Sequence, residues 1–299
     1  MSNMKIALVG NIALDVTTFI GDNVLDESLE NCNVDDISTC IGGCIINHGK
    51  AMIANGINPQ IISLFSDDLI GDLLKKEMNS HGLSSKCIFP LLKENNRTVL
   101  IVKNDGNKFM FSKRAMLPKQ DIIEDRIIPE LIKYDFIHFS LNNWTKEIVK
   151  KIHNHNPNIS LSTDLHLDID MIDAKIISHM KIVFFSGAND NNPIQTIYRI
   201  LSMGAEIVIC TNGKDGCLVG EKNLGIEKFE AINQSKPIID TVGAGDIFAA
   251  TFLSEFYNGI KIEDAILKAT IQAGDSCTKL GLDKLMNKKE LDSEMDKYL

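Results

Sequence analysis

A short run of small residues, Gly243, Ala244 and Gly245, stands directly before Asp246 and an apolar segment at 247–256. Small residues let the backbone approach a ligand closely, and successive N–H groups in such a turn can converge on one point. The positive end of the helix expected to follow would favour an anion at that point. The spacing therefore predicts an anion hole for the charge that develops on a phosphoryl group during transfer.

Asp246 is expected at the start of that helix, beside the anion hole. A carboxylate in this position can accept a proton from an attacking hydroxyl group, which is the work of a general base. Spacing alone equally allows a structural role, in which the Asp246 side chain caps a helix behind a glycine-rich turn. Both interpretations stay open at this level.

Short apolar runs rich in β-branched residues recur along the chain and alternate with segments of helical periodicity. Runs that are apolar almost throughout are typical of buried central strands, so the alternation predicts a mostly parallel sheet with helices on both faces. The predicted strands are Ile6–Val9, Ile61–Phe65, Phe136–Ser140, Ile159–Ser162, Ile182–Phe185 and Ile207–Cys210. The predicted helices are Asn47–Ala54, Ile70–Ser80, Ile122–Ile132, Thr145–His153, Pro193–Met203 and an exposed helix in Lys284–Leu299.

Four other runs read as short strands and interrupt this alternation: Val16–Ile20, Asp36–Ile41, Arg97–Lys103 and Lys108–Phe111. The sequence at 104–106, Asn-Asp-Gly, is a turn signal between the last two. We expect one domain over residues 1–299 with an inserted β-flap, or lid, formed near 16–41 and 97–111. The alternative is an extension of the main sheet at its edge.

Composition excludes several classes of function. The 299 residues are 44% hydrophobic and 24% charged with a net charge of −9, which fits a globular protein and argues against nucleic acid as a partner. Seven scattered cysteines without a CxxC pair predict reduced thiols. The apolar run at 6–9 is too short for a signal peptide, and no run reaches the roughly 20 residues that span a bilayer. We therefore expect a cytoplasmic protein without a membrane partner.

The stretch DTVGAGDIFAATFL at 240–253 resembles the C-terminal signature of the ribokinase-like (PfkB) carbohydrate and nucleoside kinases. Four further segments resemble motifs of the same family, in the same order along the chain. The resemblance implies a three-layer α/β/α fold with a mostly parallel central sheet and a small β-lid. The four segments are Gly10–Asp15, Gly42–Asn47, Ser66–Gly71 and Thr211–Gly216.

The resemblance also implies a role for individual residues. Asp246 would take the proton from the acceptor hydroxyl, and the turn at 243–245 would form the anion hole. Asp15 would bind acceptor hydroxyls in a pocket lined by Gly42, Gly43 and Asn47. The implied contacts to ATP phosphates, ribose and adenine are Thr211, Gly213, Gly216 and Thr270.

ATP and Mg²⁺ are the cofactors that the resemblance implies, and many family members are also activated by K⁺. The potassium site would consist of the Asp side chain that begins the signature and nearby carbonyl groups. Most of its ligands are backbone atoms, so side-chain identity tests the site poorly. The positions at the family's spacing are Asp240, Val242, Ser276, Lys279 and Gly281.

Two segments depart from the family pattern. The N-x-x-E motif, which helps to organise magnesium and phosphates, falls on Ser186 and Asn189, with Asp190 one residue late. Mg²⁺ can still be held by ATP phosphates and water, because this ion keeps most of its hydration shell. After the two glycines of the acceptor pocket, Ile45 and Ile46 replace small residues, and one of them is expected to narrow the pocket while the other enters the core.

Four other residues are weaker candidates for the site. Arg97 could pair with a carboxylate or phosphate on the substrate, or it could be a solvated lid residue. Asn142 and Asn143 follow a strand at its carboxyl end, where open α/β sheets bind ligands. His166 also follows a strand and is a pocket candidate.

The sequence thus predicts ATP-dependent phosphorylation of a hydroxyl group on a small sugar or sugar derivative. A nucleoside kinase on the same fold is an alternative, although one Trp and four Tyr supply no clear aromatic shelf for a base. A non-catalytic ligand-binding relative is another alternative, motivated by the altered N-x-x-E segment. An exposed lid edge would also gain from pairing in a homodimer.

Overall fold

The computed structural model describes residues 4–20, 34, 36–102, 108–165, 173–188, 190–233, 236–279, 281 and 285–298. Three features of the sequence interpretation, namely His166, Asn189 and the turn at 104–106, lie outside the described residues.

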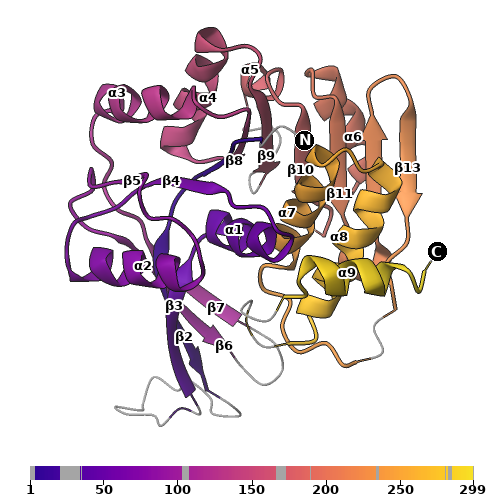
Figure 1. Cartoon of the computed structure of the whole chain (residues 1–299), viewed down its shortest axis with the longest axis horizontal. Coiled ribbons are helices and arrows are strands. Elements are labelled where there is room, and N and C mark those ends of the chain that lie inside the picture. The colour runs from indigo at the N-terminus through magenta and orange to yellow at the C-terminus, as the bar shows by residue number, and fades with distance from the viewer. Residues whose placement is uncertain are drawn as a thin grey trace.

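Nine described strands form one central sheet, in the order β13-β12-β11-β10-β9-β8-β1-β4-β5 (Figure 1). Neighbours from β11 to β5 pair in parallel, and the hairpin of β12 and β13 adds two antiparallel strands at one edge. The ribbon confirms the predicted mostly parallel sheet. The strands are β1 (Ile6–Val9), β4 (Gln60–Leu64), β5 (Ile88–Phe89), β8 (Phe136–Ser140), β9 (Ser160–Leu165), β10 (Ile182–Ser186), β11 (Ile207–Thr211), β12 (Cys217–Glu221) and β13 (Gly225–Phe229).

Helices cover both faces of this sheet, and alternate residues of a strand enter two separate cores. In β1, Ile6 and Leu8 enter one core while Ala7 and Val9 enter the other. The first core is closed by α1 (Cys44–Ala54), α2 (Leu69–Ser80), α7 (Ala244–Tyr257) and α8 (Ile262–Ser276). The second core is closed by α3 (Gln120–Leu131), α4 (Asn143–His155), α5 (Ala174–Ile177) and α6 (Pro193–Ser202).

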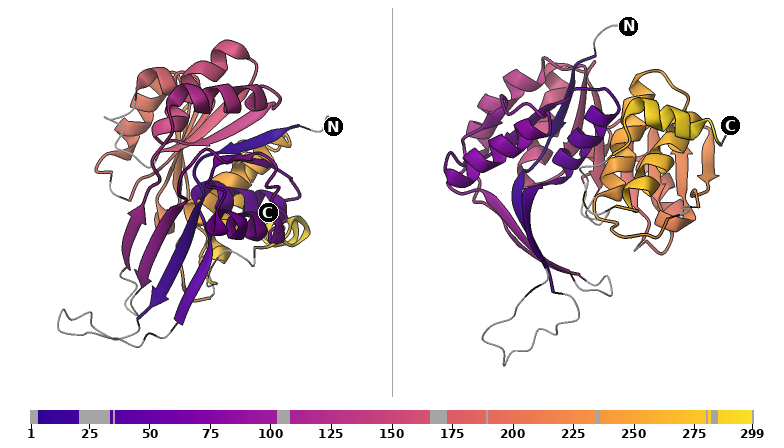
Figure 2. Two further views of the ribbon diagram at one scale, coloured as in Figure 1. Left: turned by 90° about the vertical axis from the view of Figure 1, so that its left-hand side faces the viewer. Right: turned by 60° about the horizontal axis from the view of Figure 1, so that its bottom comes forward.

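A separate four-stranded sheet, in the order β3-β2-β6-β7, extends away from the body of the molecule (Figure 2). Strands β2 and β6 pair in parallel at its centre, with β3 and β7 antiparallel at its edges. These strands do not extend the edge of the main sheet, so the edge-extension alternative is wrong. The strands of this lid sheet are β2 (Ala13–Phe19), β3 (Asp36–Gly42), β6 (Asn96–Val102) and β7 (Lys108–Lys113).

The predicted elements recur in the structure with boundaries that move by a few residues at either end. The charged tail contains one helix, α9 (Lys288–Met295), which packs against α8. No described helix combines the length and apolar character needed to cross a bilayer. The six cysteines in the described part of the chain are free thiols.

Candidate active site

The glycine turn before α7 faces open space. Gly243 precedes the helix with φ +76°, a left-handed conformation that favours glycine, and Ala244 is the first helical residue. A Cβ atom built on Gly245 would meet nothing within 4 Å. The Ala244 N–H donates to the carbonyl oxygen of Thr241 at 3.3 Å. The remaining N–H groups of a first helical turn have no partner within the helix, so this turn can receive an anion.

Asp246 lies in the first turn of α7 and is held by a residue that is distant in sequence. The Nδ2 of Asn47 on α1 donates to Oδ2 of Asp246 at 2.7 Å. The Asp246 side chain is partly exposed, so it is neither sealed in the core nor directed freely into bulk solvent. A hydrogen bond from the Asn47 amide fixes the carboxylate in one orientation. This is the geometry expected of a carboxylate that accepts a proton.

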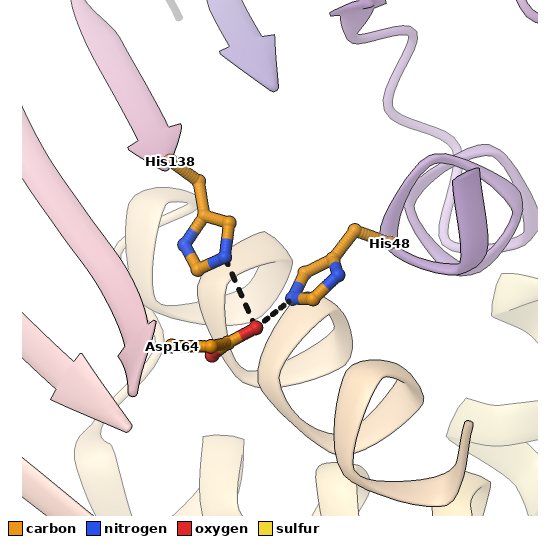
Figure 3. Close-up of side chains that lie close together, drawn as sticks. All are labelled: His48, His138 and Asp164. Carbon is orange, nitrogen blue, oxygen red and sulfur yellow. Dashed lines mark hydrogen bonds and ion pairs between the residues drawn. The ribbon is translucent and has the colours of Figure 1, made fainter. Parts of the chain in front are cut away.

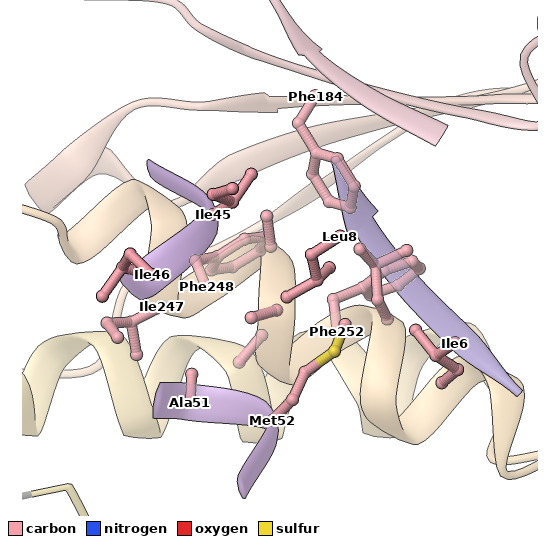
Figure 4. Close-up of a cluster of buried hydrophobic side chains, with 14 of the residues drawn as sticks. Ile6, Leu8, Ile45, Ile46, Ala51, Met52, Phe184, Ile247, Phe248 and Phe252 are labelled. Atoms are coloured by element: carbon pink, nitrogen blue, oxygen red, sulfur yellow. The ribbon is translucent and has the colours of Figure 1, made fainter. Parts of the chain in front are cut away.

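The pairing of Asn47 with Asp246 depends on the core beneath it. Apolar side chains of α1, including Ile46 and Met52, pack with Ile247 and Phe252 of α7 in one buried cluster (Figure 4). Buried clusters of this kind are packed as densely as organic crystals, so helices joined by one shift little relative to each other. The core therefore sets the distance between the two polar side chains.

Asp15 extends from the lid sheet and has one unsatisfied oxygen. It lies on β2 opposite Thr98 of β6 and Cys40 of β3. Its Oδ1 is buried without a hydrogen-bond partner. Burial raises the pKa of Asp15, and a hydrogen bond with Thr98 opposes this shift in part. A buried carboxylate oxygen that lacks a donor is suited to receive a hydroxyl group from a ligand.

Gly42 and Gly43 allow the lid sheet to join the body of the molecule beside Asp15 and Asn11. A Cβ atom on Gly42 would lie 1.7 Å from Oδ2 of Asp15, so only glycine fits beside that carboxylate. Gly43 has φ +110°, and a Cβ atom there would lie 2.4 Å from the carbonyl oxygen of Asn11. The predicted pocket residues Asp15 and Gly42 are therefore in direct contact, and Gly43 follows Gly42 in the chain.

The predicted nucleotide loop forms a tight turn after β11. Asn212 N–H donates to the carbonyl of Gly216 at 2.8 Å, and a short 3-10 turn (Gly213–Asp215) lies between them. Gly216 has φ +81°, and its Cβ atom would lie 2.0 Å from the carbonyl of Phe229. A Cβ atom on Gly213, with φ +54°, would meet nothing within 4 Å. The first glycine of the loop is thus open to a ligand, and the last one closes the turn.

The segment that replaces the N-x-x-E motif lies next to this loop. A Cβ atom on Gly187 would lie 2.3 Å from Oδ1 of Asn212, and the Gly187 N–H donates to the carbonyl of Thr211 at 2.9 Å. The side chain of Asp190 accepts a hydrogen bond from the Asn192 N–H at 2.8 Å. Asp190 therefore caps its own turn, and its substitution for the missing Glu stays a prediction.

The candidate cation segments also meet in the structure. The N–H groups of Ile239 and Asp240 both donate to the carbonyl of Cys277, at 2.8 and 3.1 Å. This contact brings Asp240 to the C-terminal end of α8, beside Ser276. Asp240 Oδ1 accepts a hydrogen bond from the Val242 N–H at 2.9 Å. Lys279 pairs with the Asp275 carboxylate, and Gly281 has φ +69°.

Two predicted contact residues have structural partners of their own. Thr270 on α8 donates its hydroxyl to the carbonyl of Ile266 at 2.8 Å. Asn142 caps α4 by accepting hydrogen bonds from the N–H groups of Trp144 and Thr145, at 3.1 and 3.3 Å. Substrate contacts by Thr270 and Asn142 stay predictions.

Arg97 lies on the lid and pairs with an acidic neighbour. Its Nη2 lies 3.0 Å from Oε2 of Glu94, and the same carboxylate lies 3.1 Å from Nζ of Lys113. The side chain of Arg97 is 47% exposed. Arg97 is therefore a half-exposed lid residue paired with Glu94, and its contact with a substrate stays a prediction.

The expectation that Ile45 or Ile46 narrows the acceptor pocket is wrong. Both side chains are fully buried in the core that α1 shares with the main sheet. Helix α1 begins at Cys44, three residues earlier than predicted, so both isoleucines lie within a helix whose inner face is apolar.

Sequence reasoning missed a buried polar cluster formed by His48, His138 and Asp164 (Figure 3). The Nε2 of His48 lies 2.9 Å and that of His138 lies 3.3 Å from Oδ2 of Asp164. Burial by itself lowers the pKa of His48, but the charges of Asp164 and Asp246 outweigh burial and raise it to about 9. Burial opposes ionisation of Asp164, yet the two histidines hold its pKa below the ordinary value. The available signals were a histidine in the middle of the apolar run of β8 and a carboxylate near the end of the buried strand β9.

Comparison with known proteins places this geometry in a family. The family model for the pfkB family carbohydrate kinases matches residues 4–289, and the chain belongs to that family. It is similar to the acarbose 7(IV)-phosphotransferase of Actinoplanes sp., with 24% identity over 230 residues that cover 75% of each chain.

Solved structures show the same fold. A microbiome-derived acarbose kinase aligns with a TM-score of 0.83 at 20% identity, over 98% of this chain and 99% of the other. Arabidopsis thaliana ribokinase complexed with ribose and ATP aligns with a TM-score of 0.81 at 13% identity, over 98% of both chains. The fold is therefore ribokinase-like, as predicted, and the chain is a phosphotransferase that acts on an alcohol group.

Proposed function

We propose that this protein transfers the γ-phosphate of ATP to a hydroxyl group of a small sugar or sugar derivative. The observation that carries the proposal is the position of Asp246, which Asn47 holds at 2.7 Å beside an open glycine turn. In the reaction, the acceptor oxygen attacks the γ-phosphorus, its proton passes to the Asp246 carboxylate, and ADP leaves with the electrons of the broken P–O bond. The turn at 243–245 supplies N–H groups to the charge on the transferring group.

The acceptor site is proposed to lie between the lid and α7. Asp15, whose Oδ1 has no donor, would receive one or two acceptor hydroxyls. Asn47 and Asp246 would face the hydroxyl that reacts. Closure of the lid sheet over the acceptor would exclude water, which otherwise competes for the phosphoryl group.

The donor site is proposed to lie between the turn at 211–216 and the N-terminus of α7. Gly213 leaves room for phosphates, and Thr270 would lie near the adenine. Magnesium would be held chiefly by the ATP phosphates and water, because the altered motif lacks its Glu and Asp190 accepts a hydrogen bond from the Asn192 N–H within its own turn. A potassium ion is proposed to bind where the segment at 240–242 meets the end of α8, because the N–H groups of Ile239 and Asp240 join these segments through the Cys277 carbonyl.

The base assignment is tested by Asp246→Asn. We expect turnover, measured as ADP release with a sugar panel, to fall by about 10²- to 10⁴-fold, while ATP binding measured by calorimetry is retained. Asp72→Asn is the matched control, since Asp72 also lies in the first turn of a helix, α2, but is 72% exposed. Near-normal turnover of Asp246→Asn would disprove the base assignment.

The acceptor class is tested with a thermal-shift panel of sugars and nucleosides. We expect sugars to raise the melting temperature, because a ligand that binds only the folded state stabilises it by mass action. Acceptors that bind should then support ADP release. If acceptors bind but none of them supports ADP release, the protein is better explained as a non-catalytic ligand-binding protein. Stabilisation by nucleosides alone would favour a nucleoside kinase.

The lid is also proposed to pair two copies of the chain. Its strands expose large apolar side chains, among them Ile37 and Phe111, each 61% exposed. Exposed apolar edge strands are prone to pair with another chain. Light scattering should show a dimer, and Phe111→Lys should shift it towards the monomer.

A further inference from the structure

Three side chains that the proposed reaction does not use meet inside the protein. His48 on α1, His138 on β8 and Asp164 at the end of β9 come from three different elements (Figure 3). His48 and His138 are fully buried, and Asp164 is 6% exposed. One possible ligand atom from each residue lies within 4.8 Å of the other two. Charged and polar groups this deeply buried need partners that compensate for lost solvation.

The two imidazoles direct the same ring nitrogen towards one carboxylate oxygen. Their Nε2 atoms lie 2.9 and 3.3 Å from Oδ2 of Asp164. Two ligand atoms bound tetrahedrally to one zinc ion at about 2.0–2.2 Å lie roughly 3.3–3.6 Å apart. The observed spacing is close to that of a filled site, and small side-chain shifts would complete it.

The Nδ1 atom of each histidine has a polar partner outside the three-residue cluster. His48 Nδ1 lies 2.7 Å from the carbonyl of Cys44, which can only accept, so this nitrogen carries a proton. His138 Nδ1 lies 2.7 Å from Oγ of Ser162. Metal-binding histidines are oriented in this way, with the distal nitrogen bonded to a backbone carbonyl or another polar group. The arrangement leaves both Nε2 atoms for the centre of the cluster.

Hydrogen bonding within the cluster is incomplete. His48 Nε2 is close to Asp164 Oδ2 but is not aligned for a hydrogen bond, and Asp164 Oδ1 is buried without any partner. An unsatisfied charged group at this depth carries a desolvation penalty that other contacts must offset. A cation between the three side chains would engage His48 Nε2 together with Asp164 Oδ2, the carboxylate oxygen that both imidazoles face.

We propose that His48, His138 and Asp164 bind one divalent transition-metal ion of the zinc type. Two imidazoles and a carboxylate suit zinc and its neighbours, whereas magnesium favours oxygen ligands alone. This site is separate from any magnesium that arrives with ATP. Because the site is buried, the ion is incorporated as the chain folds.

The ion would hold helix α1 in place, and α1 carries the Asn47 amide on the acceptor side. His48 directly follows Asn47 on α1, and Asn47 donates to Asp246. A metal bond from His48 to β8 and β9 fixes the position of α1 on the sheet. The ion therefore acts as a positioning element, and it takes no part in phosphoryl transfer.

The first test measures metal in the wild-type protein. Protein from zinc-supplemented cultures should retain about one zinc per chain after dialysis against a weak chelator, by mass spectrometry of the elements. Protein produced with cobalt should show the visible absorption of Co²⁺ bound to nitrogen and oxygen ligands. Folded wild-type protein with neither metal would overturn the proposal, whatever its kinase activity.

The second test locates the ion. His138→Gln and Asp164→Asn should each weaken zinc binding by at least about 100-fold, because each removes a direct ligand. His153→Gln is the matched control, since His153 also lies against a second histidine, His179, with ring centroids 4.3 Å apart. Retention of full zinc by folded His138→Gln would place the ion elsewhere and contradict the proposal. If both ligand variants fail to fold, the wild-type measurement decides alone.

Discussion

The proposed donor and acceptor halves of the site use different chemical groups. On the donor side, the turns at 211–216 and 243–245 offer backbone N–H groups held in place by glycines with positive φ. On the acceptor side, Asp15, Asn47 and Asp246 offer side chains from the lid, α1 and α7. Backbone groups recognise a phosphate whatever the neighbouring side chains are, whereas side chains can be exchanged to suit a new acceptor. The division explains how one fold keeps its donor while its acceptor varies.

Gly245→Ala provides the sharpest test of the donor half. The new methyl group meets no protein atom within 4 Å, so the fold should be unaffected or slightly stabilised. It would project towards the transferring phosphate, and we expect kcat to fall by about 10²-fold, comparable with the loss of one oxyanion donor. Unchanged kcat in the folded variant would show that this turn does not face the reaction.

Asp15→Asn provides the corresponding test of the acceptor half. Loss of a charged hydrogen-bond acceptor should raise the KM for the sugar by about 10- to 100-fold, equivalent to about 1.5–3 kcal/mol, with little change in the KM for ATP. Steady-state kinetics with each substrate varied in turn measure both values. An equal rise in both would contradict the separation of the two halves.

The same Asp15→Asn variant should be more stable than the wild type at neutral pH. Burial raises the pKa of Asp15 above 3.8, so keeping the ionised carboxylate in the folded protein opposes folding at pH values above that raised pKa. The penalty disappears below pH 3.8, where the carboxyl group is protonated in both states. The gain in unfolding free energy should therefore shrink as the pH falls through this window, as urea titrations at several pH values would show.

Gly42→Ala tests the fit between the lid and the body. The Cβ atom would lie 1.7 Å from Asp15 Oδ2, so the carboxylate must move, and we expect a loss of about 1–3 kcal/mol in unfolding free energy. Adding Asp15→Ala should restore most of the stability without restoring activity, since contacting residues are coupled. Additive effects in the double variant would show that the two residues do not collide.

Arg97→Ala should have the smallest effect. Its partner is the exposed Glu94, and exposed pairs contribute about 0.2–1 kcal/mol. The KM for an uncharged sugar should therefore change by about fivefold at most. A much larger rise with an anionic acceptor would assign Arg97 to substrate recognition and would identify the charge of that substrate.

The sequence was most informative where structure depends on local signals. The bounds of strands β1 and β8 were predicted to the residue, and the glycine turns were located. Both depend on apolar runs and small residues that can be recognised directly in the sequence. The hydrogen bond between Asn47 and Asp246 joins residues 199 positions apart, so only the family resemblance suggested that they share a site. His138 stayed hidden because its neighbours in β8 are apolar, and its partner lies on another strand. The direction of Ile45 and Ile46 depended on where α1 begins, which spacing did not determine.

Two of the connections between lid and body lie against each other. Residues 10–12 join β1 to β2, and Gly43 joins β3 to α1, where a Cβ atom on Gly43 would lie 2.4 Å from the carbonyl oxygen of Asn11. A swing of the lid would therefore act on the start of α1, the helix that carries Asn47. We expect the lid to behave as a lever that releases the grip on Asp246 when it opens. A kinase whose lid controls Asp246 in this way would hydrolyse little ATP while no acceptor is bound.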